Sequence, residues 1–257
     1  LQATSVLVGV LGVFFAWRLA QEIWDEKSAR KVAWVMALFP TVVQYGALTM
    51  REAWIVLFFI FGLIGVVRWA KNGGLGPVAG GIAAFSVATF FHGGMFVAIF
   101  AFLGLISARA GNQLLSGLSR GRVSAFAVIG LTLAIGGIGG YIGSGIDLPK
   151  LGTPAEAVDV QRWAEKFDNQ SRGEARYGSW QVPSHPTEML WIAPTKSVYF
   201  LFSPFPWDLR SPRHLIGLLD GLLYLGLAFL VWRHRRTIWA DPARRTVLMM
   251  LFAMVFS

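Results

Sequence analysis

The sequence predicts an all-α protein, a polytopic bundle of about eight transmembrane helices with one long extracytoplasmic loop that contains an amphipathic helix. Hydrophobic residues make up 55% of the 257 residues and charged residues only 14%, whereas soluble domains carry about 25% charged residues. Apolar runs recur along the chain, and several approach the roughly 20 residues that a helix needs to cross a hydrocarbon core. Arginine and lysine gather at the ends of these runs, which is typical of loops on the cytoplasmic side.

The first part of the chain predicts three crossings. The run Thr4–Trp17 is the end of a first span and leads into a polar segment, Arg18–Lys31. Two further runs, Val32–Thr49 and Ala53–Val67, follow back to back, and we predict that they form a transmembrane hairpin. Because the chain begins without Met and ends inside an apolar run at Ser257, we expect that both ends are truncated.

The apolar segment Leu75–Ile106 is too long for one ordinary span and is interrupted at His92, Gly93 and Gly94. We predict two short spans that meet at this break. With two crossings, the basic segment Arg109–Arg122 lies on the same side as the earlier basic segments, as the positive-inside bias requires. A single tilted helix is the alternative, and it would place these arginines outside.

The remaining spans complete the predicted bundle. Span six, Val123–Ser144, leads outward, and span seven, Leu215–Trp232, returns to an arginine-rich segment. Residues 1–144 then hold transmembrane helices one to six, residues 145–213 the extracytoplasmic loop, and residues 214–257 the C-terminal transmembrane helices. Span six also carries glycines at the four-residue spacing that lets another helix, in this chain or in a second copy, approach closely. These pairs are Gly136 with Gly140 and Gly139 with Gly143.

The long loop has two recognisable segments. Thr153, Pro154 and Glu156 form a capping-box pattern with proline at the first helical position. Apolar residues then recur at helical spacing, which predicts an amphipathic helix on the membrane surface or against the bundle. They are Val160, Trp163, Ala164 and Phe167. The segment Trp191–Trp207 is apolar but interrupted by Pro194, Pro204 and Pro206, so we predict an interfacial or re-entrant segment.

Several function classes find no support in the sequence. The net charge is +9, but no basic stripe with interleaved aromatic residues lies outside the apolar runs, so we expect no nucleic-acid partner. There is no P-loop, GxSxG, HExxH or dinucleotide fingerprint. The chain has no cysteine and its four histidines are scattered, so we expect no metal site and no cofactor, and a divalent cation has no support in the sequence.

Three features share the outer face under this topology: the turn at Arg51 and Glu52, the break at His92, and the long loop. Arg51 is a candidate ligand of a phosphate or diphosphate, because a guanidinium bonds phosphate oxygens in a bidentate way. Glu52 is a candidate catalytic residue that orients Arg51 or accepts a proton from an incoming hydroxyl, and His92 is a second donor or base. The alternatives are a mutually neutralising Arg51–Glu52 pair that marks a turn, and a His92 that only packs. Further candidate diphosphate ligands, or else plain solvated charges, are Arg172, Arg176 and Arg210.

Two segments, FPTVVQYGALTMREA (Phe39–Ala53) and YFLFSPFPWDLRSP (Tyr199–Pro212), resemble bacterial polytopic proteins of polysaccharide assembly. These are multi-spanning glycosyltransferases of the GT-C type and the related O-antigen and exopolysaccharide polymerases. The resemblance implies a multi-pass protein of the bacterial inner membrane that transfers a sugar from a polyprenyl (di)phosphate donor at the outer face. It also implies membrane lipids and other polysaccharide-assembly proteins as partners. Such enzymes commonly carry an acidic motif in the first outer loop, which would lie upstream of Leu1.

The leading hypothesis is therefore a membrane glycosyltransferase or polymerase in which Glu52 and His92 are catalytic and the arginines bind the lipid diphosphate. One alternative is a transporter or flippase of a lipid-linked anion, which would use the break at His92 as a discontinuous helix lining a path. Another is a non-enzymatic subunit that packs into a larger complex through its glycine-rich span.

Overall fold

The computed structural model describes residues 2–39, 51–118, 125–145, 153, 188–208 and 214–255. These residues form helices joined by turns, with no strand among them, which confirms the all-α class. The chain divides into two units by its internal contacts. The first comprises residues 1–145, 234–255 and 257, and the second comprises residues 146–233 and 256.

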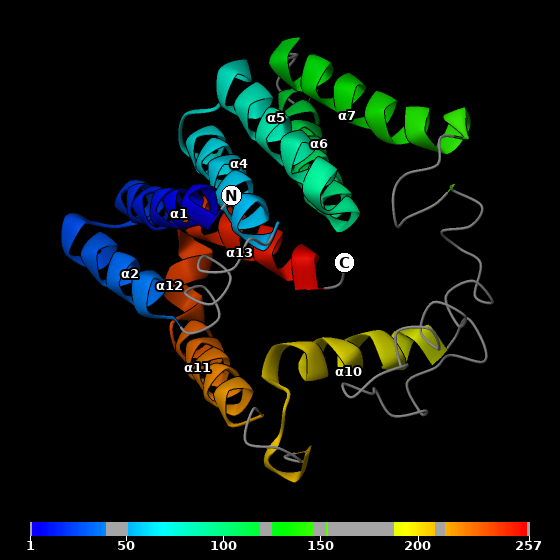
Figure 1. Ribbon diagram of the computed structural model, residues 1–257. Helices are drawn as coiled ribbons and strands as arrows, with labels where there is room; N and C mark the ends of the chain where they lie inside the picture. The colour runs from blue at the N-terminus through cyan, green and yellow to red at the C-terminus, as the bar shows by residue number, and fades with distance from the viewer. Residues whose placement is uncertain are drawn as a thin grey trace. The chain divides into compact units, whose positions relative to one another are not determined.

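The first unit is built around α4 (Glu52–Asn72), which contacts α1 (Gln2–Ile23), α5 (Leu75–Phe91) and α13 (Pro242–Val255) (Figure 1). Because α4 is apolar on all sides, it needs neighbours or lipid around its whole circumference. Its partners supply them, together with α6 (Phe96–Leu118). The largest fully buried side chains of the described residues come from these helices and are Val66, Val67, Phe85, Phe102 and Met250.

The hairpin of α1 and α2 (Glu26–Leu38) corrects two predicted boundaries. α1 continues beyond Trp17 to Ile23, and α2 begins inside the polar segment instead of at Val32. α2 then ends at Leu38, whereas we expected one helix from Val32 to Thr49. Phe39 is extended, with φ −67° and ψ 120°, because the ring of a following proline disfavours the helical conformation. Residues 40–50 lie outside the described residues.

Asp25 caps α2, since its Oδ1 accepts a hydrogen bond from the Ser28 amide at 2.7 Å. The hydrogen bonds from Ser28 hold the pKa of the Asp25 carboxyl below its usual value of 3.8. The cap therefore stabilises α2 fully above that value, and this contribution is lost as the pH falls through the lower folded pKa. We expect Asp25→Ala to remove this pH dependence and to lower the hydrogen-exchange protection of the first turn of α2. The start of α5, which has no side-chain cap, is the control, and unchanged protection in α2 would contradict the assignment.

α5 and α6 confirm that the segment Leu75–Ile106 holds two helices, not one. α5 ends at Phe91, His92 is extended, and a single 3₁₀ turn (Gly93–Met95) leads into α6. The two helices run antiparallel, with Gly81 and Phe85 of α5 packed against Phe102 of α6. The break is thus the turn of a helical hairpin.

α7 (Ala125–Ser144) packs antiparallel against α6. Its glycines at 130 and 137 face that helix: a Cβ at Gly130 would lie 3.4 Å from Ile106, and one at Gly137 would lie 3.5 Å from Leu103. The four glycines of the predicted close-approach pairs, at 136, 139, 140 and 143, have no atom of the described residues within 4 Å of such a Cβ. The contact between α7 and α6 therefore involves Gly130 and Gly137, which are seven residues apart, and not the predicted pairs at four-residue spacing.

The second unit contains α10 (Met189–Phe202), a 3₁₀ turn (Pro206–Asp208) and α11 (His214–Arg233). α10 runs through Pro194, so the prediction that this proline breaks the segment is wrong. α10 and α11 meet closely at glycines: Cβ atoms at Gly217 and Gly221 would lie 2.8 Å from Pro204 and 2.6 Å from the carbonyl oxygen of Phe202. The predicted amphipathic helix at residues 154–167 lies outside the described residues.

Three described helical segments are long and apolar enough to cross a membrane: Ala3–Ile23, Glu52–Asn72 and Gly93–Gly117. Leu75–Phe91 and Val128–Ser144 are shorter apolar helices. Long apolar helices of this kind indicate a membrane protein. The expected total of about eight crossings stays a prediction.

Candidate functional site

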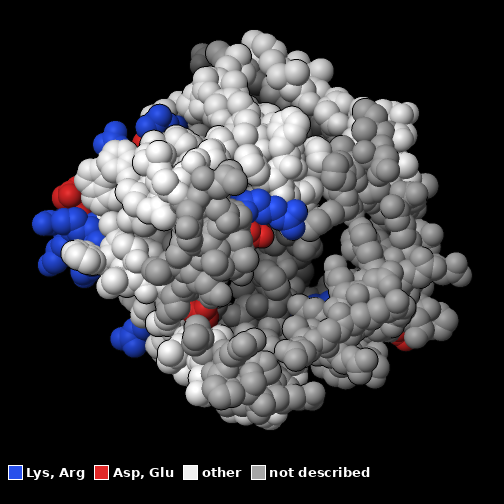
Figure 2. Space-filling model, in the orientation of Figure 1, with Lys and Arg blue, Asp and Glu red and all other residues white. Residues whose placement is uncertain are grey.

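One end of the first unit gathers basic residues from three helices, α4, α6 and α13. Arg68 of α4 donates from Nε and Nη2 to the Glu22 carboxylate of α1, at 2.9 and 2.5 Å. Arg109 of α6 donates to the carbonyl oxygens of Trp69 and Ala70, both at 3.1 Å, and its guanidinium lies over the Trp69 ring. Arg244 of α13 lies over the Trp24 ring. Figure 2 shows several blue side chains at the left edge of the view, over the connection between α1 and α2 and the turn between α4 and α5, and a further blue group beside red atoms near the middle of the view.

The opposite end of α4 carries Arg51 and Glu52. Arg51 lies at the start of the helix, where its carbonyl oxygen accepts hydrogen bonds from the amides of Trp54 and Ile55 at 3.1 Å. Its Nε lies 3.5 Å from Oε1 of Glu52, and their side chains are 59% and 35% exposed. The guanidinium is therefore neutralised in part but open to solvent, and it stands beside a helix N-terminus, which itself favours anions.

His92 lies at the same end of the first unit as this pair. Phe91 stacks on Trp54, with ring centroids 5.7 Å apart and planes within 6°, and on Phe58 at 6.1 Å. The start of α4 and the end of α5 are thus joined by an aromatic stack next to the charged pair. The amide of His92 donates to Ala88 and its carbonyl oxygen accepts from Met95, both at 3.0 Å. The backbone of the half-buried histidine is therefore fixed in the turn.

Two interpretations of the His92 ring stay open, and its surroundings bear on both. A Cβ at Gly94 would lie 3.0 Å from the ring atoms Cδ2 and Nε2. Glycine at this position therefore leaves room for the imidazole to lie over its own turn. The ring fills space there, and the residue as a whole is partly buried.

The structure places Arg51, Glu52 and His92, the site residues predicted on α4 and at the hairpin turn, at the same end of the α4–α5 pair. The other predicted residues, Arg172, Arg176 and Arg210, lie outside the described residues. No group of three or more potential metal ligands occurs in the described part of the chain.

Two ionisable residues in the apolar helices of the second unit were not singled out from the sequence. Lys196 lies in α10 and is partly buried, and burial lowers the pKa of its ammonium to about 8. Asp220 lies in α11 among leucines and is also partly buried. Each could have been found as a single ionisable residue within an apolar run. Burying such a side chain costs free energy, and residues of this kind are therefore often functional.

The segment that carries the second part of the family resemblance forms an aromatic cluster. Phe205 stacks on Trp207, with centroids 4.8 Å apart and planes within 6°, and meets Tyr199 edge-on at 5.0 Å. The Trp207 side chain is 72% exposed, so this segment presents an aromatic surface.

The chain matches no protein-family model, no curated protein and no solved structure. The resemblance to polysaccharide-assembly proteins therefore depends on its two sequence segments alone. Of the first segment, the structure describes Phe39 and Arg51–Ala53, and of the second it describes Tyr199–Asp208.

Proposed function

We propose that this chain is a multi-pass enzyme of the bacterial inner membrane that transfers or polymerises saccharide units carried on a polyprenyl (di)phosphate, at the outer face. The observation that supports it most is the arrangement of the first unit. Arg51, Glu52 and His92 share one end of the α4–α5 pair, and the basic residues occupy the other end. With the basic end cytoplasmic, the candidate site opens at the outer face, where such donors are used.

In the proposed reaction the Arg51 guanidinium binds the diphosphate of the donor. The bond between the anomeric carbon and the diphosphate oxygen breaks, and the diphosphate leaves with the electron pair. An acceptor hydroxyl forms the new glycosidic bond, and its proton passes to Glu52 or His92. Stabilising the negative charge that develops on the departing diphosphate is the main catalytic contribution.

The transporter alternative depended on a discontinuous helix at His92 that lines a path. In the described residues 75–118 the break is instead the turn between two antiparallel helices. A hairpin turn of this kind does not favour the transporter over the enzyme, and we keep the enzyme as the proposed function.

The test compares two matched arginines. Arg51→Ala removes the proposed diphosphate ligand, and Arg30→Ala removes an exposed arginine of α2 that is paired with Glu26 at 3.9 Å. The full chain is reconstituted in liposomes with polyprenyl-diphosphate-linked saccharides extracted from bacterial membranes, and new glycosidic linkages are measured. Binding of a sugar-free polyprenyl diphosphate is measured in parallel.

We expect Arg51→Ala to abolish polymer formation and to weaken diphosphate binding at least about 10-fold, because a charge-assisted bidentate contact contributes about 1.5–3 kcal/mol. Arg30→Ala should match the wild-type chain in both assays, and both variants should insert and accumulate normally, since both side chains are exposed. Wild-type polymer levels with Arg51→Ala would remove the site. Relocation of the donor without any new linkage would identify a transporter, and tolerance of substitution at both Arg51 and His92 would favour a structural subunit.

A further inference from the structure

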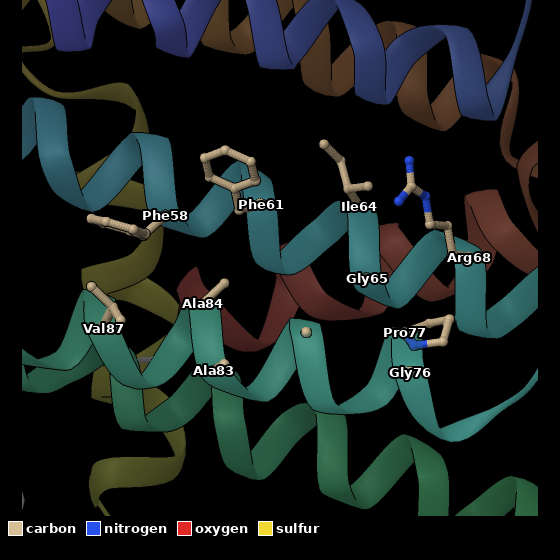
Figure 3. A pocket seen from close by; sticks show the side chains of 11 residues that line it. Phe58, Phe61, Ile64, Gly65, Arg68, Gly76, Pro77, Ala83, Ala84 and Val87 are labelled. Carbon is tan, nitrogen blue, oxygen red and sulfur yellow. The ribbon is translucent and has the colours of Figure 1, made fainter.

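A groove of about 570 Å³ runs along the surface between α4 and α5. Its α4 wall consists of Phe58, Phe61, Ile64 and Gly65 and ends at Arg68. Figure 3 shows the α5 wall opposite, with Pro77, Ala83, Ala84 and Val87 along the helix. Apart from Arg68, every side chain that lines the groove is apolar.

The groove exists because α5 presents almost no side chain on this side. Gly76, Gly80 and Ala84 follow one another at four-residue spacing, so they lie in one row along the helix. A Cβ built at Gly76 or Gly80 meets no atom of the described residues within 4 Å. The space beside α5 is therefore open along two helical turns, while the larger side chains of α4 form the other wall.

The length of the groove matches one leaflet of a bilayer. From Phe58 to Arg68 the helix rises about 15 Å, at about 1.5 Å per residue. A hydrocarbon core is roughly 30 Å thick, so the groove extends over about half of it. α4 itself has the length and hydropathy of a membrane-spanning helix, which places the apolar part of the groove at acyl-chain depth and Arg68 near the headgroups.

The charged end of the groove is suited to an anion. Arg68 bonds the Glu22 carboxylate, and Lys71, one turn further along α4, donates to the backbone carbonyl oxygen of Glu22. The carboxylate of Glu22 is bonded by Arg68 alone, while Lys71 bonds a neutral carbonyl oxygen, so these three groups together carry one positive charge. The Arg68 side chain stays 52% exposed within this arrangement, so it can contact a further anion. A phosphodiester carries one negative charge.

We propose that the α4–α5 groove binds one acyl chain of an anionic phospholipid whose phosphate lies at Arg68 and Lys71. The headgroup end of this site is at the basic end of the first unit, and the proposal is independent of the proposed enzymatic function. A helix of a second copy is the competing occupant, because a row of small residues also suits close helix packing. The positive charge at the end of the groove favours the lipid.

The experiment fills the groove without disturbing the core. Gly80→Leu places a side chain in open space inside the groove, and Gly104→Leu places the same side chain in open space on α6 as the matched control. Lys71→Gln removes one positive charge at the charged end of the groove. Each purified full-length variant is mixed with dioleoylphosphatidylglycerol or dioleoylphosphatidylcholine, and bound lipid is measured by native mass spectrometry. A phosphatidylglycerol with a photoreactive group on its acyl chain is crosslinked in parallel, and the labelled peptides are mapped.

We expect the wild-type chain and Gly104→Leu to retain phosphatidylglycerol and to crosslink at α4 and α5, and Gly80→Leu to lose most of both signals. Lys71→Gln should weaken phosphatidylglycerol binding about five-fold and leave phosphatidylcholine binding unchanged, as expected for one cation near an anionic headgroup. Wild-type lipid binding by Gly80→Leu, or crosslinks confined to other helices, would overturn the proposal. So would a dimer that Gly80→Leu converts to a monomer without any change in bound lipid, since the groove would then hold a second copy.

Discussion

Gly65→Ala should destabilise the first unit, whereas Gly80→Ala, one methyl group added on the facing helix, should stabilise it. A Cβ at Gly65 would lie 2.8 Å from the Cα and amide nitrogen of Gly81 and 2.8 Å from the carbonyl oxygen of Pro77. All three are backbone atoms, so no side chain can rotate away, and α4 and α5 must separate. Gly80 has open space instead, and there alanine only gains helix propensity, about 1 kcal/mol over glycine.

The two variants should change the free energy of unfolding in opposite directions, so each serves as the control for the other. Overpacking a tight contact costs about 1–3 kcal/mol, and separation of α4 from α5 also loosens Phe85, which is fully buried against Gly62. Thermal and denaturant-induced unfolding of the two variants in the same detergent would measure the difference. Equal stability of Gly65→Ala and the wild-type chain would show that α4 and α5 do not meet as closely as the structure shows.

Charge and hydropathy predicted the all-α class and the turn between α5 and α6, but not the bounds of α1 and α2 or the continuity of α10. The α5–α6 hairpin followed from the need to keep Arg109 on the side of Arg68, and the structure places Arg109 against the end of α4. The end of α2 was missed because the apolar run continues past Phe39, although Pro40 was visible. The error at Pro194 was the reverse, because we expected this proline to break a segment that is helical in the structure. α10 accommodates it, and within the same turn Thr195 donates its hydroxyl to the carbonyl oxygen of Trp191.

For the candidate site, the predicted topology gave only which residues lie at the same face of the membrane. Counting crossings predicted that Arg51 and His92 share one face, and in the first unit they lie at the same end. The stacking of Trp54 on Phe91 that joins them depends on the crossing of two helices, which hydropathy does not encode. The same holds for Arg68 and Glu22, which are separated by 46 positions in the chain.

We expect a thiol at Lys27 and a thiol at Ser144 to react from opposite sides of the membrane. The chain has no cysteine, so Lys27→Cys and Ser144→Cys each introduce a single reactive group at an exposed position. Lys27 lies in the first turn of α2, which follows the end of α1 that carries Glu22, and so at the basic end. Ser144 ends α7, whose Tyr141 lies 5.5 Å from Phe100 at the opposite end of α6.

The positive-inside bias predicts that the basic end is cytoplasmic. A membrane-impermeant maleimide applied to spheroplasts should therefore label Ser144→Cys at once and Lys27→Cys only after permeabilisation, an all-or-none difference. Denatured samples of both variants control for intrinsic reactivity. If Lys27→Cys reacts from outside and Ser144→Cys does not, the orientation is inverted, Arg51 and His92 face the cytoplasm, and an extracytoplasmic polyprenyl-linked donor cannot reach them. If both thiols react from the same side, the basic end and the end with Arg51, Glu52 and His92 do not lie on opposite sides of the bilayer. The crossings that we predict for α4 and α6 would then be wrong.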